Sequence, residues 1–217
     1  MNKKINKIHF NKWDNSFIPH ILKELYIDRV YDSFLVGKKD LIIIDLGANI
    51  GLWSMYAAEY AKHIYAFEPS EKTKEVLTKN LAPIEKMVTV CPYAISNKNE
   101  QKKFFTNPSN TTANTLLGGS GDHCETVNCL TLDTAFEKYK IEHVDFMKID
   151  IEGSEFDVLG GSGFEKVAPK IDCILGEMHS WVGRNYNQLK FALELNGFAV
   201  KFFKRDASLF SAVRKDT

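Results

Sequence analysis

The sequence has few cysteines, and none of them form a motif that binds zinc or exchanges disulfides. Its four cysteines include no C-x-x-C pair and no paired zinc-ligand spacing. We therefore expect free thiols in a reducing compartment. A disulfide between Cys124 and Cys129 is the alternative that their spacing leaves open.

The sequence also lacks an excess of charge and a long apolar run. Its 28 lysines and arginines balance its 28 aspartates and glutamates, so bulk charge gives no reason to expect nucleic acid or an anionic membrane as partner. No apolar signal core follows the basic first residues, and no stretch approaches the length of a transmembrane helix. These absences predict a soluble, cytoplasmic protein and leave its oligomeric state open.

What the sequence does contain is a regular alternation of apolar runs and helical patterns. With 217 residues, 44% of them hydrophobic, it can bury the core of one domain. The last two apolar runs are joined by only three residues, 205–207, so they must be antiparallel strands. Strands are expected near 41–46, 63–68, 87–93, 144–150, 171–177, 198–204 and 208–214, and helices near 51–61, 71–80, 131–139, 154–160 and 186–197.

This order predicts an α/β fold with a Rossmann-like three-layer sandwich. Its sheet would have seven mostly parallel strands with an antiparallel last strand, which resembles the sheet of class I methyltransferases. Residues 1–40 are expected to form an N-terminal helical extension, because Ile18, Ile21, Leu22 and Leu25 follow a helical spacing. Residues 41–217 would form a single domain with an insertion at about 101–130.

The turn between the first strand and its helix is the most informative segment. The run I-I-I-D-L-G-A-N-I-G over residues 42–51 ends a strand in Asp45 and breaks at Gly47 and Gly51. A dinucleotide-binding turn of the G-x-G-x-x-G type would need glycine where Asn49 and Leu52 stand. The segment therefore predicts a nucleotide-like ligand other than a dinucleotide.

Two acids at strand ends favour one kind of ligand. Asp45 would repel a pyrophosphate but attract an adenosine compound that carries positive charge, and S-adenosylmethionine fits this description. Glu68 ends the second strand, where an acid commonly accepts hydrogen bonds from both ribose hydroxyls. An ordinary strand-to-helix turn capped by two acids is the alternative.

A second group of polar residues follows the strands expected at 144–150 and 171–177. Asp150 and Glu177 come at the carboxyl ends of these strands, and His179 stands two residues after Glu177. We expect Asp150 and His179 to share proton removal, with Glu177 orienting His179 or binding substrate hydroxyls. Glu155, in the first turn of the next helix, is interpreted as structural. We expect no metal; a divalent cation held by Asp150, Glu177 and His179 is an alternative.

The insertion contains two further predicted strands, at 102–106 and 125–130, around a polar, glycine-rich loop. On composition this loop is a disordered surface connection. Its expected position on the edge that carries the ligand turn favours a lid or an acceptor-binding loop instead. The sequence leaves both interpretations open.

These motifs, in this order, resemble the FkbM-type methyltransferases over roughly residues 41–180. The resemblance rests on I-D-L-G-A-N-I-G, A-F-E-P-S, Y-A-I-S, L-T-L-D, K-I-D-I-E-G-S-E and the E-x-H that closes a strand. It implies a class I fold, S-adenosylmethionine as cofactor, and O-methylation, often of a sugar hydroxyl on a glycan or natural product. By the family pattern the cofactor-binding residues are Asp45, Gly47, Asn49, Gly51 and Glu68, with Ala94 and Ile95 near the adenine.

The acceptor is the least determined part of this interpretation. The sequence has D-I-E-G where enzymes that methylate exocyclic amines carry an Asn/Asp-Pro-Pro-Tyr turn, which argues against a nucleobase acceptor. We expect a hydroxyl-bearing acceptor, most simply a sugar in a glycan, a glycolipid or a natural product. The alternatives are a small non-sugar hydroxyl, a cofactor-binding scaffold without turnover, and a dinucleotide-dependent oxidoreductase.

Overall fold

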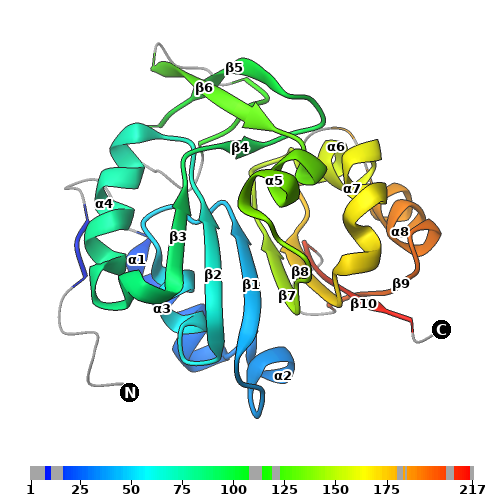
Figure 1. The fold of residues 1–217 in the computed structure, drawn as a ribbon, viewed down its shortest axis with the longest axis horizontal. Coiled ribbons are helices and arrows are strands. Elements are labelled where there is room, and N and C mark those ends of the chain that lie inside the picture. The colour runs from blue at the N-terminus through cyan, green and yellow to red at the C-terminus, as the bar shows by residue number, and fades with distance from the viewer. Residues whose placement is uncertain are drawn as a thin grey trace.

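The computed structural model describes residues 8–10, 17–107, 114–118, 123–179, 183, 185–203 and 208–215. Its centre is a seven-stranded sheet with the strand order β3-β2-β1-β7-β8-β10-β9 (Figure 1). Strand β10 is antiparallel to both of its neighbours, and the other pairs are parallel, as predicted. The strands are β1 Leu41–Leu46, β2 Ala61–Phe67, β3 Val88–Cys91, β7 Phe146–Ile149, β8 Cys173–Glu177, β9 Phe198–Phe202 and β10 Leu209–Arg214.

Helices cover both faces of this sheet, which confirms the three-layer architecture (Figure 1). One face carries α1 Ile18–Lys23, α3 Leu52–Ala57 and α4 Glu71–Leu81, and the other carries α5 Leu132–Tyr139, α6 Glu155–Leu159, α7 Ser162–Val167 and α8 Tyr186–Leu195. Helix α7 was not predicted from the sequence.

Strand β1 shows how the sequence produces two cores. Side chains alternate between the faces of a strand, so Leu41 and Ile43 pack into the core beneath α1, α3 and α4. Ile44 and Leu46 pack into the core beneath α5 to α8. A strand buried on both faces needs a continuous apolar run, which residues 41–44 supply.

The N-terminal segment packs on the first of these cores. Helix α1 continues directly into a π-helical turn, Glu24–Asp28, and a short helix α2, Asp32–Leu35, follows. Ile18 and Leu25 of the predicted apolar stripe are buried, and Ile21 and Leu22 are partly buried against the same core. This packing attaches the segment to the sheet.

The predicted insertion strands form a second, smaller sheet above the first (Figure 1). It has the order β4-β6-β5, with β4 Ala94–Ile95, β5 Glu100–Phe105 and β6 Cys124–Leu130. Cys124 and Cys129 lie toward opposite ends of β6, and all four cysteines are free. Residues 108–113 and 119–122 of the polar loop lie outside the described part of the chain, so both interpretations of that loop stay predictions.

No helix among the described residues is long and apolar enough to cross a lipid bilayer.

Candidate functional site

A pocket opens at the carboxyl ends of β1, β2, β7 and β8, where α/β sheets commonly bind ligands. Its walls come from the strand-end turns, from β4 and β5, and from the N-terminal segment. Seven of the ten predicted site residues line it: Gly47, Asn49, Glu68, Ala94, Ile95, Asp150 and Glu177. Asp45, Gly51 and His179 are not among the lining residues.

Gly47 brings the turns after β1 and β7 into contact. Its φ is +79°, a left-handed backbone conformation that side chains disfavour. A Cβ atom at this position would stand 1.9 Å from the carbonyl oxygen of Asp150. Glycine at this position therefore lets the two strand ends approach each other beside the pocket.

Gly51 lies at the start of α3, where it packs against α4. It begins α3 with a φ of +87°, and a Cβ there would lie 2.7 Å from Leu77 Cδ1 of α4. The residue therefore allows α3 and α4 to pack closely, and its predicted contact with the donor stays a prediction.

Glu68 joins the turns after β1 and β2. It is buried, and its two carboxylate oxygens accept hydrogen bonds from the backbone N–H groups of Asn49 (3.1 Å) and Ser70 (2.9 Å). Burial raises the pKa of Glu68 to about 7, against the lowering effect of these two bonds. Each oxygen keeps a lone pair with which it can accept a further hydrogen bond, for instance from a ribose diol.

Asp45 lies beneath the turn, fully buried, where it accepts a hydrogen bond of 2.7 Å from Ser54 Oγ. Its other oxygen, Oδ1, lies 3.5 Å from Lys148 Nζ and has no hydrogen-bond partner among the described residues. Asp45 was predicted to repel a pyrophosphate and to attract a positively charged adenosine compound. Lys148 offsets its negative charge in the structure, and a role of Asp45 in binding the donor stays a prediction.

Lys148 is the functional residue that the sequence analysis missed most clearly. Its Nζ donates to the carbonyl of Gly47 (3.1 Å) and lies 3.4 Å from Asp150 Oδ2. Burial alone would lower the pKa of Lys148, but Asp150 and Asp45 raise it, so the amine stays charged. A lysine two residues before Asp150, inside a buried strand, was the signal that could have revealed it.

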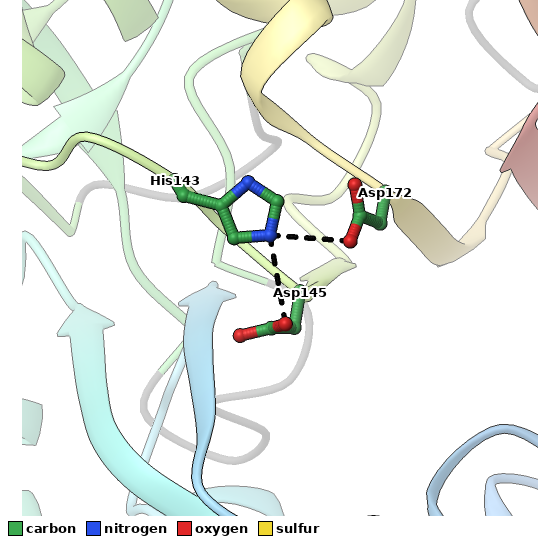
Figure 2. A group of neighbouring side chains, drawn as sticks. All are labelled: His143, Asp145 and Asp172. Atoms are coloured by element: carbon green, nitrogen blue, oxygen red, sulfur yellow. Dashed lines mark ion pairs between the residues drawn. The ribbon is translucent and has the colours of Figure 1, made fainter. Parts of the chain in front are cut away.

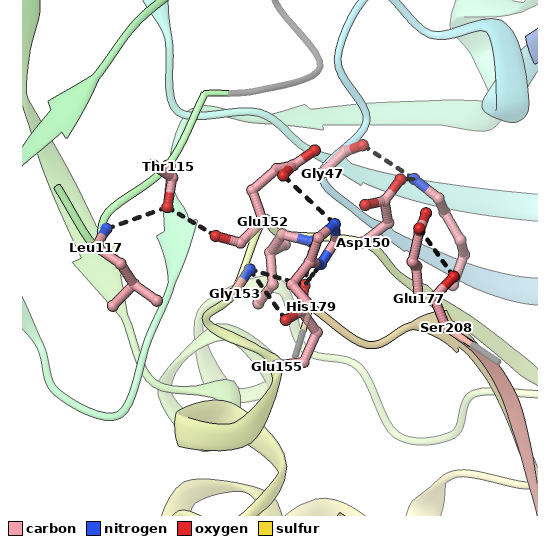
Figure 3. Close-up of polar contacts among 12 residues, drawn as sticks. Gly47, Thr115, Leu117, Asp150, Glu152, Gly153, Glu155, Glu177, His179 and Ser208 are labelled. Carbon is pink, nitrogen blue, oxygen red and sulfur yellow. Dashed lines mark hydrogen bonds and ion pairs between the residues drawn. The ribbon is translucent and has the colours of Figure 1, made fainter. Parts of the chain in front are cut away.

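His179 contacts two glutamates that the sequence analysis did not pair with it (Figure 3). Its Nδ1 lies 2.9 Å from Glu155 Oε1, and its Nε2 lies 3.4 Å from Glu152 Oε2. Burial alone would lower the pKa of His179, but the hydrogen bond to Glu155 and the nearby carboxylates raise it to about 9. Burial raises the pKa of Glu152 to about 8, against the opposing charge of His179.

Glu155 makes a contact that was not predicted from the sequence. It was interpreted as structural, and its fully buried carboxylate accepts the N–H groups of Ile151 and Gly153 and also contacts His179. Glu177 was expected to orient His179 or to bind substrate hydroxyls. The structure places Glu155 against the imidazole, while Glu177 Oε1 accepts a hydrogen bond of 3.0 Å from Ser208 Oγ on the pocket side (Figure 3).

Among the described residues, two groups of side chains have the composition of a metal site. Ligand atoms of Asp150, Glu155 and His179 lie within 4.8 Å of one another, so Glu155 takes the place that the metal alternative assigned to Glu177. The second group, His143, Asp145 and Asp172, lies before β7 and β8, at the opposite end of the sheet (Figure 2). There His143 Nε2 is 3.1 Å from Asp172 and 3.5 Å from Asp145, contacts that join the two strand starts.

Comparison with known proteins identifies the family of this chain. The profile of a family described as the methyltransferase FkbM domain matches residues 45–207. Over 67% of its length the chain is 26% identical to the hexuronic acid methyltransferase AglP of Haloferax volcanii, of which the match covers 59%. Over 88% of its length it is 27% identical to the AMB antimetabolite synthetase AmbE of Pseudomonas aeruginosa, of which it spans 11%. The chain thus corresponds to only part of these relatives.

Solved structures show the same fold at low sequence identity. A methyltransferase FkbM from Methylobacillus flagellatus superposes with a TM-score of 0.56 at 13% identity, over 83% of this chain and 45% of that one. A fibrillarin pre-rRNA processing protein from Methanococcus jannaschii superposes with a TM-score of 0.52 at 16% identity, over 83% and 69% of the two chains. The fold class is therefore confirmed as that of the class I methyltransferases.

The residues of the pocket fit an adenosine-based methyl donor. Gly47 leaves room beside Asp150, and buried Glu68 offers free lone pairs at the end of β2, where a ribose would lie. With the family profile covering most of its length, the chain belongs to the FkbM-domain methyltransferases, and the cofactor of its methyltransferase domain is S-adenosylmethionine.

Proposed function

We propose that the protein is an S-adenosylmethionine-dependent O-methyltransferase whose acceptor is a sugar hydroxyl in a glycan, a glycolipid or a natural product. The observation that carries this proposal is the contact of His179 with Glu155 and Glu152 next to the donor pocket. A hydroxyl has to lose its proton when it is methylated, and this group of side chains can take one. The hexuronic acid methyltransferase among the relatives supports a sugar acceptor.

S-adenosylmethionine supplies an activated methyl group when it is bound, so the work of this chain is alignment and proton removal. Glu152 lines the pocket and lies between it and His179. We infer that the acceptor proton passes to the Glu152–His179 pair as the oxygen–methyl bond forms and the methyl–sulfur bond breaks. Glu155 holds the imidazole by its Nδ1 and is a positioning residue.

For Glu177 we keep the predicted contact with acceptor hydroxyls, and we extend it to Asp150, which was predicted to share proton removal with His179. Both line the pocket at the ends of neighbouring strands β7 and β8. Carboxylates at this position can accept hydrogen bonds from acceptor hydroxyls and keep the reacting oxygen in line with the methyl group. We propose this role for both, with Asp150 held in place by Lys148.

The test is to incubate the protein with methyl-labelled S-adenosylmethionine and a cell extract fractionated into glycolipids, nucleotide sugars, nucleic acid and protein. We expect label in a sugar-containing product, as an alkali-stable methyl ether. His179→Ala should abolish this transfer, whereas His143→Ala, which removes a histidine from the opposite end of the sheet, should not. Label in nucleic acid or protein would overturn the acceptor class, and a protein that binds the donor without transferring label would be a scaffold.

A further inference from the structure

The N-terminal segment contributes a wall of the pocket that the family profile does not cover. The profile match begins at residue 45, yet Ile21, Glu24, Leu25 and Tyr31 line the pocket. The π-helical turn that begins at Glu24 is a local irregularity of a kind often found at functional sites. Its polar member in the pocket is Glu24, which is only partly exposed.

Glu24 lies among carboxylates. The charges that act on it are those of Lys148, Asp150 and Glu177, and the Tyr31 hydroxyl donates a hydrogen bond to it. Burial, together with Asp150 and Glu177, raises the pKa of Glu24, against Lys148 and Tyr31. Burying a carboxylate beside other carboxylates costs free energy unless a positive charge lies next to it.

The positively charged side chain nearest to these carboxylates already has other partners. Lys148 is the basic residue among the described lining residues, and its amine is shared by Asp45, Asp150 and the carbonyl of Gly47. Glu24 therefore adds negative charge beyond what Lys148 compensates. The surplus favours a ligand that carries a positive group at this end of the pocket.

The strand order indicates which part of the donor reaches Glu24. Glu68 ends β2, on one side of β1, whereas Asp150 and Glu177 end β7 and β8, on the other side. Neighbouring strands are about 4.8 Å apart, so β2 and β7 are about 10 Å apart across β1. A donor with its ribose at Glu68 would therefore have its amino-acid part on the side of Gly47 and Glu24.

We propose that Glu24 binds the ammonium group of the methionine part of S-adenosylmethionine, so that residues 18–31 complete the donor site. The proposal rests on the donor assignment and does not depend on the identity of the acceptor. It gives the N-terminal segment a defined role: the carboxylate attaches it to the bound donor, and Tyr31 holds that carboxylate through its hydroxyl.

The experiment measures binding of two donor-like ligands by calorimetry, without any acceptor. The ligands are S-adenosylhomocysteine and its analogue that lacks only the amino group. The proteins are the wild type, Glu24→Gln and, as a matched control, Asp28→Asn, which removes an exposed carboxylate of the same turn. We expect Glu24→Gln to weaken the binding of S-adenosylhomocysteine about tenfold and to leave the affinity for the deaminated analogue unchanged. Asp28→Asn should change neither affinity.

Equal losses for both ligands would mean that Glu24 supports the fold rather than the ammonium, and would overturn the proposal. Unchanged S-adenosylhomocysteine binding in Glu24→Gln would place Glu24 outside the donor site and also overturn the proposal. Glu24→Asp, which keeps the charge, should restore part of the preference for the amino group. Thermal unfolding of each variant checks that it is folded. Because no acceptor is present, failure of the sugar assignment leaves these outcomes unaffected.

Discussion

His179 and Glu155 are joined by a contact of 2.9 Å between Nδ1 and Oε1, and the carboxylate of this pair is fully buried. The same carboxylate accepts the backbone N–H groups of Ile151 and Gly153, so it is held firmly in the turn after β7. The imidazole orientation is thus set by the loop that also carries Asp150. This relationship connects the ends of β7 and β8 at the proposed acceptor side.

Glu155→Gln should shift the pH dependence of methyl transfer to lower pH. In the wild type the nearby carboxylates raise the pKa of His179 to about 9, so its basic form and the rate should rise with pH up to that value. Removing the negative charge of Glu155 lets burial dominate, which lowers the pKa of His179. The measurement is kcat/KM from about pH 6 to pH 10, where the rising limb should move down by one unit or more.

The control is Glu165→Gln, which removes an exposed carboxylate of α7 and should leave the pH profile of kcat/KM unchanged. A rising limb that stays where it is in Glu155→Gln would show that His179 does not titrate in catalysis.

Glu68→Ala should weaken binding of S-adenosylhomocysteine by about 1–3 kcal/mol, because it removes the acceptor for the ribose hydroxyls and two backbone contacts of the turn. Calorimetry measures the loss. Glu75→Ala, on the exposed side of α4, is the matched control and should bind like the wild type. If Glu68→Ala binds S-adenosylhomocysteine with wild-type affinity, Glu68 only caps the end of its strand and does not bind the donor.

Lys148→Met should destabilise the fold by about 3–5 kcal/mol, because it leaves the fully buried Asp45 without a compensating charge. Urea unfolding measures the change. Asp45→Asn combined with Lys148→Met should recover much of the loss, since the uncompensated charge is then gone. A double variant as unstable as the sum of the two single variants would contradict the coupling.

Gly47→Ala should abolish donor binding and destabilise the protein more than Gly37→Ala does. Both glycines have a left-handed φ, +79° and +86°, so both substitutions carry a backbone strain of about 1–3 kcal/mol. At Gly37 a Cβ atom meets nothing within 4 Å, whereas at Gly47 it would collide with the carbonyl of Asp150. The difference in unfolding free energy therefore measures the closeness of the two strand ends. Equal losses of unfolding free energy in the two variants would show that the turns after β1 and β7 can move apart without a cost in stability.

The elements of the main sheet were predictable because their signals are local. Strand β1 has the predicted bounds, 41–46, since a continuous apolar run leads into Asp45 and Gly47. Helix α3 ends at Ala57 rather than near 61, because β2 already begins at Ala61. The division at residue 40 and the role of the 107–121 loop stay predictions.

The sequence by itself determined the fold class, the family and the strand ends that carry Glu68, Asp150 and Glu177, because periodicity and turn residues act over a few neighbouring positions. The tertiary structure decided which of these groups meet. Glu155 rather than Glu177 holds His179, and Lys148 lies between Asp45 and Asp150. Such partners depend on how buried side chains from separate elements share charge and space. The same holds for Glu24, which reaches the pocket from a segment outside the profile match.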